Sequence, residues 1–198
     1  MKKIKYIVPV LLLIVLLTGC EFGTVRHKEE EKGKNMHHIT IEVEKYGTME
    51  LELYGDEAPI SVNNFINLAK SGYYDGLTFH RNIKGFMIQG GDGSLKGKED
   101  KPSIKGEFAA NGVRNNISHT RGTIAMARTA YDYNSASTQF FIMHQDMPSI
   151  DGQYATFGRV TKGIEVVDAI LDNTPVEDDN GTTLLENQPV IKKITVID

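Results

Sequence analysis

An arginine stands within an apolar, strand-like stretch of this sequence. The segment 78–93, TFHRNIKGFMIQGGDG, has no Cys, and Thr78 is its only hydroxyl side chain, so it offers no evident nucleophile. If Phe79, Arg81 and Ile83 share one face of a strand, the guanidinium lies among apolar side chains. Burying an unpaired guanidinium costs a large free energy. Arg81 must therefore lie at the mouth of a cleft or be paired. We expect it to serve a binding site; the alternative is a purely structural ion pair or a position on the surface.

Other residue types that catalyse reactions show weaker patterns. Asp92, Asp146 and Asp151 lie close to Gly or Pro, where Asp is more typical of a turn than of an acid–base pair. The QGGDG run lacks the G-x-x-x-x-G-K-[ST] frame of a phosphate-binding loop, and the chain contains no G-x-S-x-G. The histidines show no tight metal-binding spacing, so we expect no metal and no cofactor. The histidines considered are His37, His38, His80, His119 and His144.

The N-terminal residues have the pattern of a lipoprotein signal peptide. MKKIKYIVPVLLLIVLLTGC begins with basic residues, continues with an apolar run over 6–17 and ends at Cys20. The run is shorter than the ~20 residues of a membrane-spanning helix. Its LTGC ending resembles the bacterial lipobox, whose Cys becomes the lipid-modified first residue. We predict a signal peptide over 1–19 and an extracytoplasmic protein anchored by lipid on Cys20 to the bacterial cell membrane; a plain signal peptide with a chance Cys is the alternative.

Charge and cysteine content exclude two classes of protein. The 198 residues include 22 Lys and Arg against 26 Asp and Glu, a net charge of −4 that becomes −7 once Lys2, Lys3 and Lys5 are removed. An acidic chain has no electrostatic attraction to nucleic acid, so we expect no nucleic-acid partner. Cys20 is the only cysteine, which excludes an internal disulfide framework. The length suits one domain with a substantial core.

Apolar periodicity predicts one mainly β domain behind a polar tether. Residues 20–37 are charged and lack an apolar period, which is typical of a flexible tether. Alternating apolar residues predict a hairpin of two strands that starts at residue 38. Apolar positions three and four apart predict a helix after Pro59 and a second one over 163–173. An antiparallel barrel or a sandwich would fit. Further strands are predicted over 78–89, 123–127, 139–143, 156–160 and 190–197.

Four blocks of sequence together resemble the cyclophilin family of peptidyl-prolyl cis–trans isomerases. FHRNIKGFMIQGGD, over 79–92, follows the family's F-H-R-x-I-x-G-F-M-x-Q-G-G-D. GTIAMA over 122–127 follows G-x-x-x-M-A, and TQFFI over 138–142 is similar to S-Q-F-F-I. IDG over 150–152, with TFG soon after it, is similar to the family's L-D-G and V-F-G. The resemblance covers residues 38–198 in colinear order.

The resemblance implies a fold and a set of site residues. The fold would be a closed eight-stranded antiparallel β-barrel capped by two α-helices, with the substrate groove on its outer face. Arg81 and Gln89 would be catalytic. The family often has Asn, Trp and His where this chain has Arg128, Ser149 and Tyr154, which leaves cyclosporin binding and substrate preference open. The substrate-binding residues would be Phe86, Met87, Ala127, Arg128, Thr129, Gln139, Phe141, Ile150 and Tyr154.

Isomerisation of a prolyl bond explains why the predicted site contains no nucleophile. Amide resonance sets a rotation barrier of roughly 18–20 kcal/mol. The prolyl nitrogen becomes pyramidal as the bond twists, and a guanidinium such as that of Arg81 can donate to it only in that state. We expect a monomer that acts on X–Pro bonds of exported polypeptides and assists their folding at the membrane surface. The alternative is a lipoprotein adaptor or adhesin that binds Pro peptides or a partner with little turnover; a metal hydrolase would need a bound ion.

Overall fold

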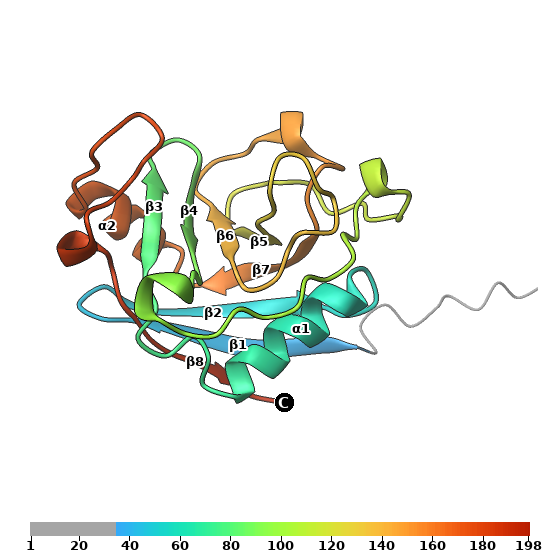
Figure 1. Cartoon of the computed structure of the whole chain (residues 1–198), viewed down its shortest axis with the longest axis horizontal. Coiled ribbons are helices and arrows are strands. Elements are labelled where there is room, and N and C mark those ends of the chain that lie inside the picture. The colour runs from blue at the N-terminus through green and yellow to red at the C-terminus, as the bar shows by residue number, and fades with distance from the viewer. Residues whose placement is uncertain (1–34) are drawn as a thin grey trace, which may run out of the picture. The chain divides into compact units, whose positions relative to one another are not determined.

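Eight antiparallel strands and two α-helices form residues 35–198, the part of the chain that the computed structural model describes (Figure 1). The predicted signal peptide, Cys20 and most of the predicted tether lie outside these residues. The first strand begins at Met36, two residues before the predicted start at residue 38. The strands are β1 (Met36–Val43), β2 (Gly47–Tyr54), β3 (Phe79–Ile83), β4 (Met87–Gly90), β5 (Thr123–Met126), β6 (Phe140–Met143), β7 (Thr156–Lys162) and β8 (Ile191–Val196). The helices are α1 (Pro59–Lys70) and α2 (Glu165–Asn173).

The strands form one open sheet, so the prediction of a closed barrel is wrong. Their order is β3-β4-β6-β5-β7-β2-β1-β8, and the two outer strands, β3 and β8, share no ladder. Another segment occupies the free edge of β3: Asn82 N–H donates to the Gly181 carbonyl, and Thr183 N–H donates to the His80 carbonyl. Only the start of β3 meets the chain at β8, where Phe79 N–H donates to the Pro189 carbonyl and Thr78 forms an isolated bridge with Val190. Beyond that point the edge is already paired, so β3 and β8 form no ladder and the sheet remains a half-barrel.

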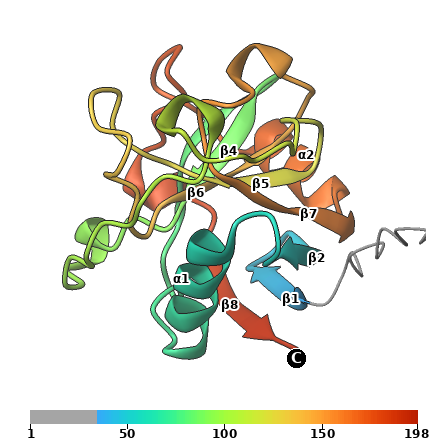
Figure 2. The ribbon, with the colours of Figure 1, turned by 90° about the vertical axis from the view of Figure 1, so that its right-hand side faces the viewer.

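The predicted hairpin and both predicted helices are confirmed. Strands β1 and β2 pair in antiparallel register, and their alternate residues are buried, as Ile39 and Leu51 illustrate. Pro59 occupies the first turn of α1, and Phe65 on its buried face meets the Phe140 ring edge-on at a centroid distance of 5.2 Å. Helix α1 packs on β8 and β2, as Figure 2 shows, while α2 contacts β2 and β3. The helices and the sheet thus enclose one aromatic-rich inner core.

The stretch predicted as one strand over 78–89 forms a hairpin of β3 and β4. Gly85, with φ +89°, lies in the turn between the two strands. A bulge shifts the register between Phe79 and Arg81, so Phe79 is fully buried in the inner core while Arg81 pairs with a residue of β4. The expectation that Phe79, Arg81 and Ile83 share one face is therefore wrong for Phe79. The extra residue of the bulge allows Arg81 and Ile83 to lie on the outer face.

Strands β4, β5 and β6 bury residues on both of their faces. Ile88 and Ile142 point into the inner core, whereas Met87 and Phe141 belong to a separate apolar cluster. Side chains alternate between the two faces of a strand, so this second cluster lies on the outer face of the sheet. Within residues 35–198 no helix is long and apolar enough to span a membrane.

Candidate active site

The outer face of the sheet carries an apolar floor, which we call the outer cluster. Its buried members are Met87, Ala125, Phe141 and Met143. Six further side chains pack against them and leave part of their surface exposed. Six of the predicted groove residues, Met87 among them, are therefore brought together here. The partly buried members are Ile83, Phe86, Ala127, Met147, Ile150 and Tyr154.

Phe86 reaches the outer cluster from the β3–β4 turn. The turn is closed by the Phe86 N–H, which donates to the Ile83 carbonyl at 3.0 Å. It is tied to the end of β6 because His144 N–H donates to the Phe86 carbonyl at 2.8 Å. The ring of His144 also takes part, since its Nδ1 accepts from Gly85 N–H at 3.0 Å. These bonds fix the backbone that carries Phe86.

Arg81 lies at the border of the outer cluster with its guanidinium oriented by two hydrogen bonds. Its Nη1 donates to Gln89 Oε1 at 3.1 Å, and its Nε donates to the Asn180 carbonyl at 2.8 Å. Within residues 35–198 no carboxylate forms an ion pair with Arg81. The alternative of a structural ion pair is thus not found in this part of the chain, and the charge remains available to a ligand.

A chain of side-chain amides runs from Arg81 to a carboxylate. Gln89 Nε2 donates to Gln139 Oε1 at 2.9 Å, and Gln139 Nε2 donates to Asp92 Oδ2 at 3.0 Å. A carboxylate can only accept, so Asp92 determines which end of each amide faces which neighbour. In this orientation the side-chain oxygen of Gln89 faces Arg81. Asp92 also accepts from Ser94 N–H at 3.0 Å, which confirms its predicted place in a turn.

A buried histidine packs against the outer cluster. His119 is fully buried, its Nδ1 lies 2.9 Å from Asp151 Oδ1, and its ring stacks on Phe141 at a centroid distance of 6.0 Å. Tyr154 meets Phe141 edge-on at 5.5 Å. Burial lowers the pKa of His119 despite the neighbouring carboxylate, which favours the neutral ring. Burial alone would raise the pKa of Asp151, but hydrogen bonds from His119 outweigh it and lower that pKa.

The pairing of His119 with Asp151 was missed by sequence reasoning. The sequence favours a turn for Asp151 over an acid–base pair, and it offers His119 only as a candidate metal ligand. The two residues are 32 positions apart, so no local spacing links them. Within residues 35–198 the structure assembles no group of three His, Cys, Asp or Glu side chains suited to a metal ion.

Arg128 is enclosed by aromatic rings at one side of the outer cluster. The centre of its guanidinium lies 4.7 Å from the centroid of Tyr154, 4.8 Å from Tyr133 and 5.3 Å from Phe108. Its Nε donates to the Gln153 carbonyl at 3.0 Å. A small pocket of about 160 Å³ lies here and contains the remaining predicted residues. The pocket is lined by Gln89, Ala127, Arg128, Thr129, Ser135, Ser137 and Gln139.

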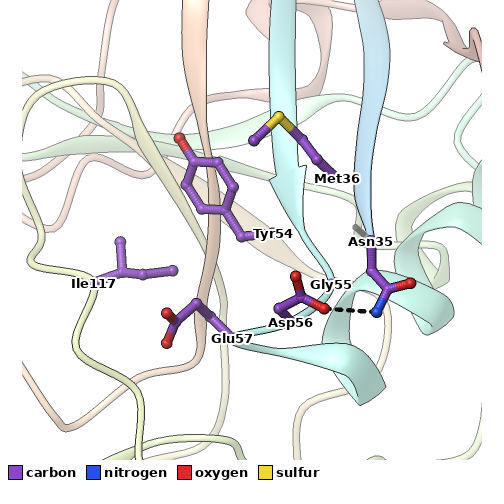
Figure 3. Close-up of a pocket in the computed structure, with 7 residues that line it drawn as sticks. All are labelled: Asn35, Met36, Tyr54, Gly55, Asp56, Glu57 and Ile117. Atoms are coloured by element: carbon purple, nitrogen blue, oxygen red, sulfur yellow. Dashed lines mark hydrogen bonds between the residues drawn. The ribbon is translucent and has the colours of Figure 1, made fainter. Parts of the chain in front are cut away.

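A separate apolar pocket of about 300 Å³ lies near the ends of β1 and β2 (Figure 3). Asn35 Nδ2 donates to Asp56 Oδ1 at 2.6 Å at its edge, and Ile117 lies on another side. None of the predicted site residues lines this pocket. We therefore place the candidate active site on the outer cluster and not in the larger hollow. The full lining is Asn35, Met36, Tyr54, Gly55, Asp56, Glu57 and Ile117.

Comparison with known proteins identifies the family to which this fold belongs. The family model described as cyclophilin type peptidyl-prolyl cis-trans isomerase/CLD matches residues 38–196. Peptidyl-prolyl cis-trans isomerase A of Dickeya dadantii is 49% identical over 131 residues, which are 63% of this chain and 66% of that protein. A peptidyl-prolyl cis-trans isomerase of Acinetobacter baylyi is 44% identical over 151 residues, 73% of this chain and 77% of that protein.

A solved structure of the same type superimposes on the fold. The cyclophilin-type isomerase of Cryptosporidium parvum is 31% identical and aligns with a TM-score of 0.70, over 82% of this chain and 98% of its own. The same protein has been solved in the presence of the dipeptide Ala-Pro, with a TM-score of 0.69. Family model, sequence relatives and fold agree, and the chain belongs to the cyclophilin-type peptidyl-prolyl cis-trans isomerases.

Proposed function

We propose that X–Pro bonds isomerise on the outer cluster, with Arg81 as the group that stabilises the transition state. The proline ring packs on Phe86, Met87 and Phe141, which supply an apolar surface of suitable size. The Arg81 guanidinium then donates to the prolyl nitrogen once that nitrogen has become pyramidal. The planar amide offers no such acceptor, so the bond forms only in the transition state and lowers the barrier. No proton is transferred in this scheme.

The free energy required is within reach of such a site. Uncatalysed prolyl isomerisation takes tens to hundreds of seconds. An increase from ~10⁻² to ~10³ s⁻¹ corresponds to about 7 kcal/mol. A charged donor that is already oriented avoids the reorganisation that water would need, which makes electrostatic stabilisation of this kind large. The Asp92–Gln139–Gln89 chain supplies this orientation for Arg81.

The observation that carries the proposal is the position of Arg81. Its guanidinium is hydrogen-bonded to Gln89 and to a backbone carbonyl, and it has no ion pair among the described residues. It borders an apolar surface on which a proline ring can pack. The Ala-Pro structure of the Cryptosporidium relative supports proline-containing peptides as the substrates.

Exchange between the cis and trans forms of a Pro peptide, measured by NMR, tests the proposal. The domain from residue 35 onward should accelerate exchange, and Arg81→Ala should reduce kcat/KM by about a hundredfold or more. Arg81→Lys keeps a charge but loses the planar donor, so it should recover only a small part. Equal exchange rates for the wild type and Arg81→Ala would favour a module that binds Pro peptides without turnover.

We also propose that the substrates are exported proteins and that the enzyme works at the outer side of a bacterial membrane. This proposal is supported by the lipobox-like sequence that ends at Cys20 and by the polar tether that follows it. The predicted tether over residues 20–37 would allow the domain to reach chains that emerge near the membrane surface. Many such chains contain X–Pro bonds whose isomerisation limits their folding.

A further inference from the structure

Among residues 35–198, no contact of Arg128 supplies a negative charge that would balance its guanidinium. Its Nη1 donates to the Thr129 carbonyl at 2.8 Å, its Nε donates to a second carbonyl, and its three ring neighbours are neutral. No ion pair involves Arg128 within residues 35–198, and in that range its Nη2 has no hydrogen-bond acceptor. A guanidinium in this state has both charge and a donor available for an anion.

The guanidinium is also fixed in place before any ligand arrives. Phe108, Tyr133 and Tyr154 come from three separate loops, and all three rings lie within 5.3 Å of its centre. Cation–π contacts with several rings favour one orientation of the planar group. A side chain that is already ordered loses little entropy on binding a ligand. Arg128 is therefore arranged as a recognition group and not as a mobile surface charge.

The pocket beside Arg128 offers the chemistry that a carboxylate requires. Arg128 is the only charged side chain among the described residues that line it. The hydroxyl groups of Thr129 and Ser135 also line it but are already engaged, since Ser135 Oγ donates to the Asp132 carbonyl at 2.7 Å and lies 2.9 Å from Thr129 Oγ1. The volume of about 160 Å³ suits one side chain of medium size. With one positive charge, an Arg128 Nη2 that has no acceptor among residues 35–198, and no acidic side chain in its lining, the pocket favours an acidic side chain over a basic one.

The pocket adjoins the reacting position. Gln89 and Gln139 line it, and the same two residues orient Arg81. A peptide with its proline on Phe141 thus has a neighbouring residue within reach of the pocket. We propose that Arg128 gives this isomerase a preference for substrates with Asp or Glu within about three residues of the proline, a distance set by the ~3.3 Å rise per extended residue. This inference rests on the isomerase function proposed above.

The test uses matched peptides that differ only in having Glu, Gln or Lys at one position. That position is placed in turn on either side of the proline. For each peptide, kcat/KM is measured from cis–trans exchange. We expect the Glu form to exceed the Gln form by about two- to fivefold at one position, the range of a partly exposed ion pair, with a larger margin over Lys. Added salt should reduce this margin.

Three variants separate charge recognition from a structural role. Arg128→Gln should bring the Glu/Gln ratio close to one, and Arg128→Lys should keep part of it, because the charge remains. Arg159→Gln removes an exposed positive charge on β7, outside the pocket, and should leave the ratio unchanged. An Arg128→Gln enzyme that is slower on every peptide but keeps the wild-type ratio would overturn the inference. So would a wild type that treats all three peptides equally, whereas no acceleration of any peptide would reject the isomerase function itself.

Discussion

Arg81 and Gln89 lie directly opposite each other in the β3–β4 ladder, and Arg81 Nη1 donates to Gln89 Oε1 at 3.1 Å. The amide of Gln89 cannot rotate freely, because its other end donates to Gln139, which in turn donates to Asp92. One carboxylate therefore determines the orientation of two amides and a guanidinium. In this arrangement Gln89 is a positioning residue for Arg81, in addition to any contact it makes with a substrate.

Replacement of Gln89 should reduce turnover more than binding. Gln89→Ala removes a hydrogen bond to a charged group, worth about 1.5–3 kcal/mol, and releases the guanidinium. We expect kcat to fall by about tenfold and KM to change little, since the apolar floor under the proline is intact. NMR exchange at several peptide concentrations provides both constants. Gln145→Ala, an exposed residue near the end of β6, is the control. An unchanged kcat in Gln89→Ala would mean that Arg81 needs no partner.

The buried His119 should make the stability of the fold depend on pH. Burial lowers the pKa of His119 below its usual value of 6.5, so the unfolded chain takes up a proton first as the pH falls. Stability is then lost as the pH falls through about 6.5 toward the lower folded-state pKa. Asp151 has a pKa lowered from 3.8, so its own contribution persists until still more acidic conditions.

Urea unfolding at about pH 7.5 and about pH 5 measures this dependence, because the interval brackets the usual pKa of His. The free energy of unfolding should decrease between the two conditions in the wild type. It should decrease less in His119→Gln, whose amide does not titrate. The same decrease in both proteins would assign the effect to other groups, of which His80, with a pKa also lowered by burial, is the first to test.

The glycines of QGGDG are predicted to allow a turn of the backbone and not to form a phosphate-binding loop. Gly91 has φ +86°, and a Cβ at this position would lie 2.7 Å from the Thr138 carbonyl oxygen. Gly91→Ala should therefore lower the free energy of unfolding by about 2 kcal/mol or more through strain and the clash. Gly85→Ala is a matched control, since Gly85 has φ +89° but nothing within 4 Å of its Cβ position. Equal losses of unfolding free energy in Gly91→Ala and Gly85→Ala would show that the clash at residue 91 contributes nothing.

Local sequence patterns predicted which helices and strands form better than they predicted which strand residues face the core and which segments pair. Helix α1 follows from Pro59 and from apolar residues at helical spacing, because both act within one or two turns. The inward position of Phe79 depends on a bulge, and the pairing of the β3 edge depends on Gly181 and its neighbours about a hundred residues away. Such long-range pairing leaves no period in the sequence.

The candidate site shows the same division. Arg81, Gln89 and Phe141 could be placed together only through the resemblance of whole sequence blocks, since their spacing alone predicts no contact. The roles of Asp92 and of His119 with Asp151 were not predicted, because a turn residue or a buried histidine shows no sign of its partner in the sequence. These supporting contacts become visible only once the strands are paired.

The lipid anchor leads to a prediction that can be checked independently of catalysis. If Cys20 is lipidated, Cys20→Ala should release the protein from the membrane fraction or leave it with an unprocessed signal peptide. Two acyl chains bury enough methylene groups, at about 0.8 kcal/mol each, for stable attachment, whereas an acidic domain has no affinity of its own for anionic lipid. Cell fractionation combined with mass spectrometry of the N-terminal peptide measures both outcomes. A fully processed Cys20→Ala protein that still fractionates with membranes would show that something other than lipid attaches it.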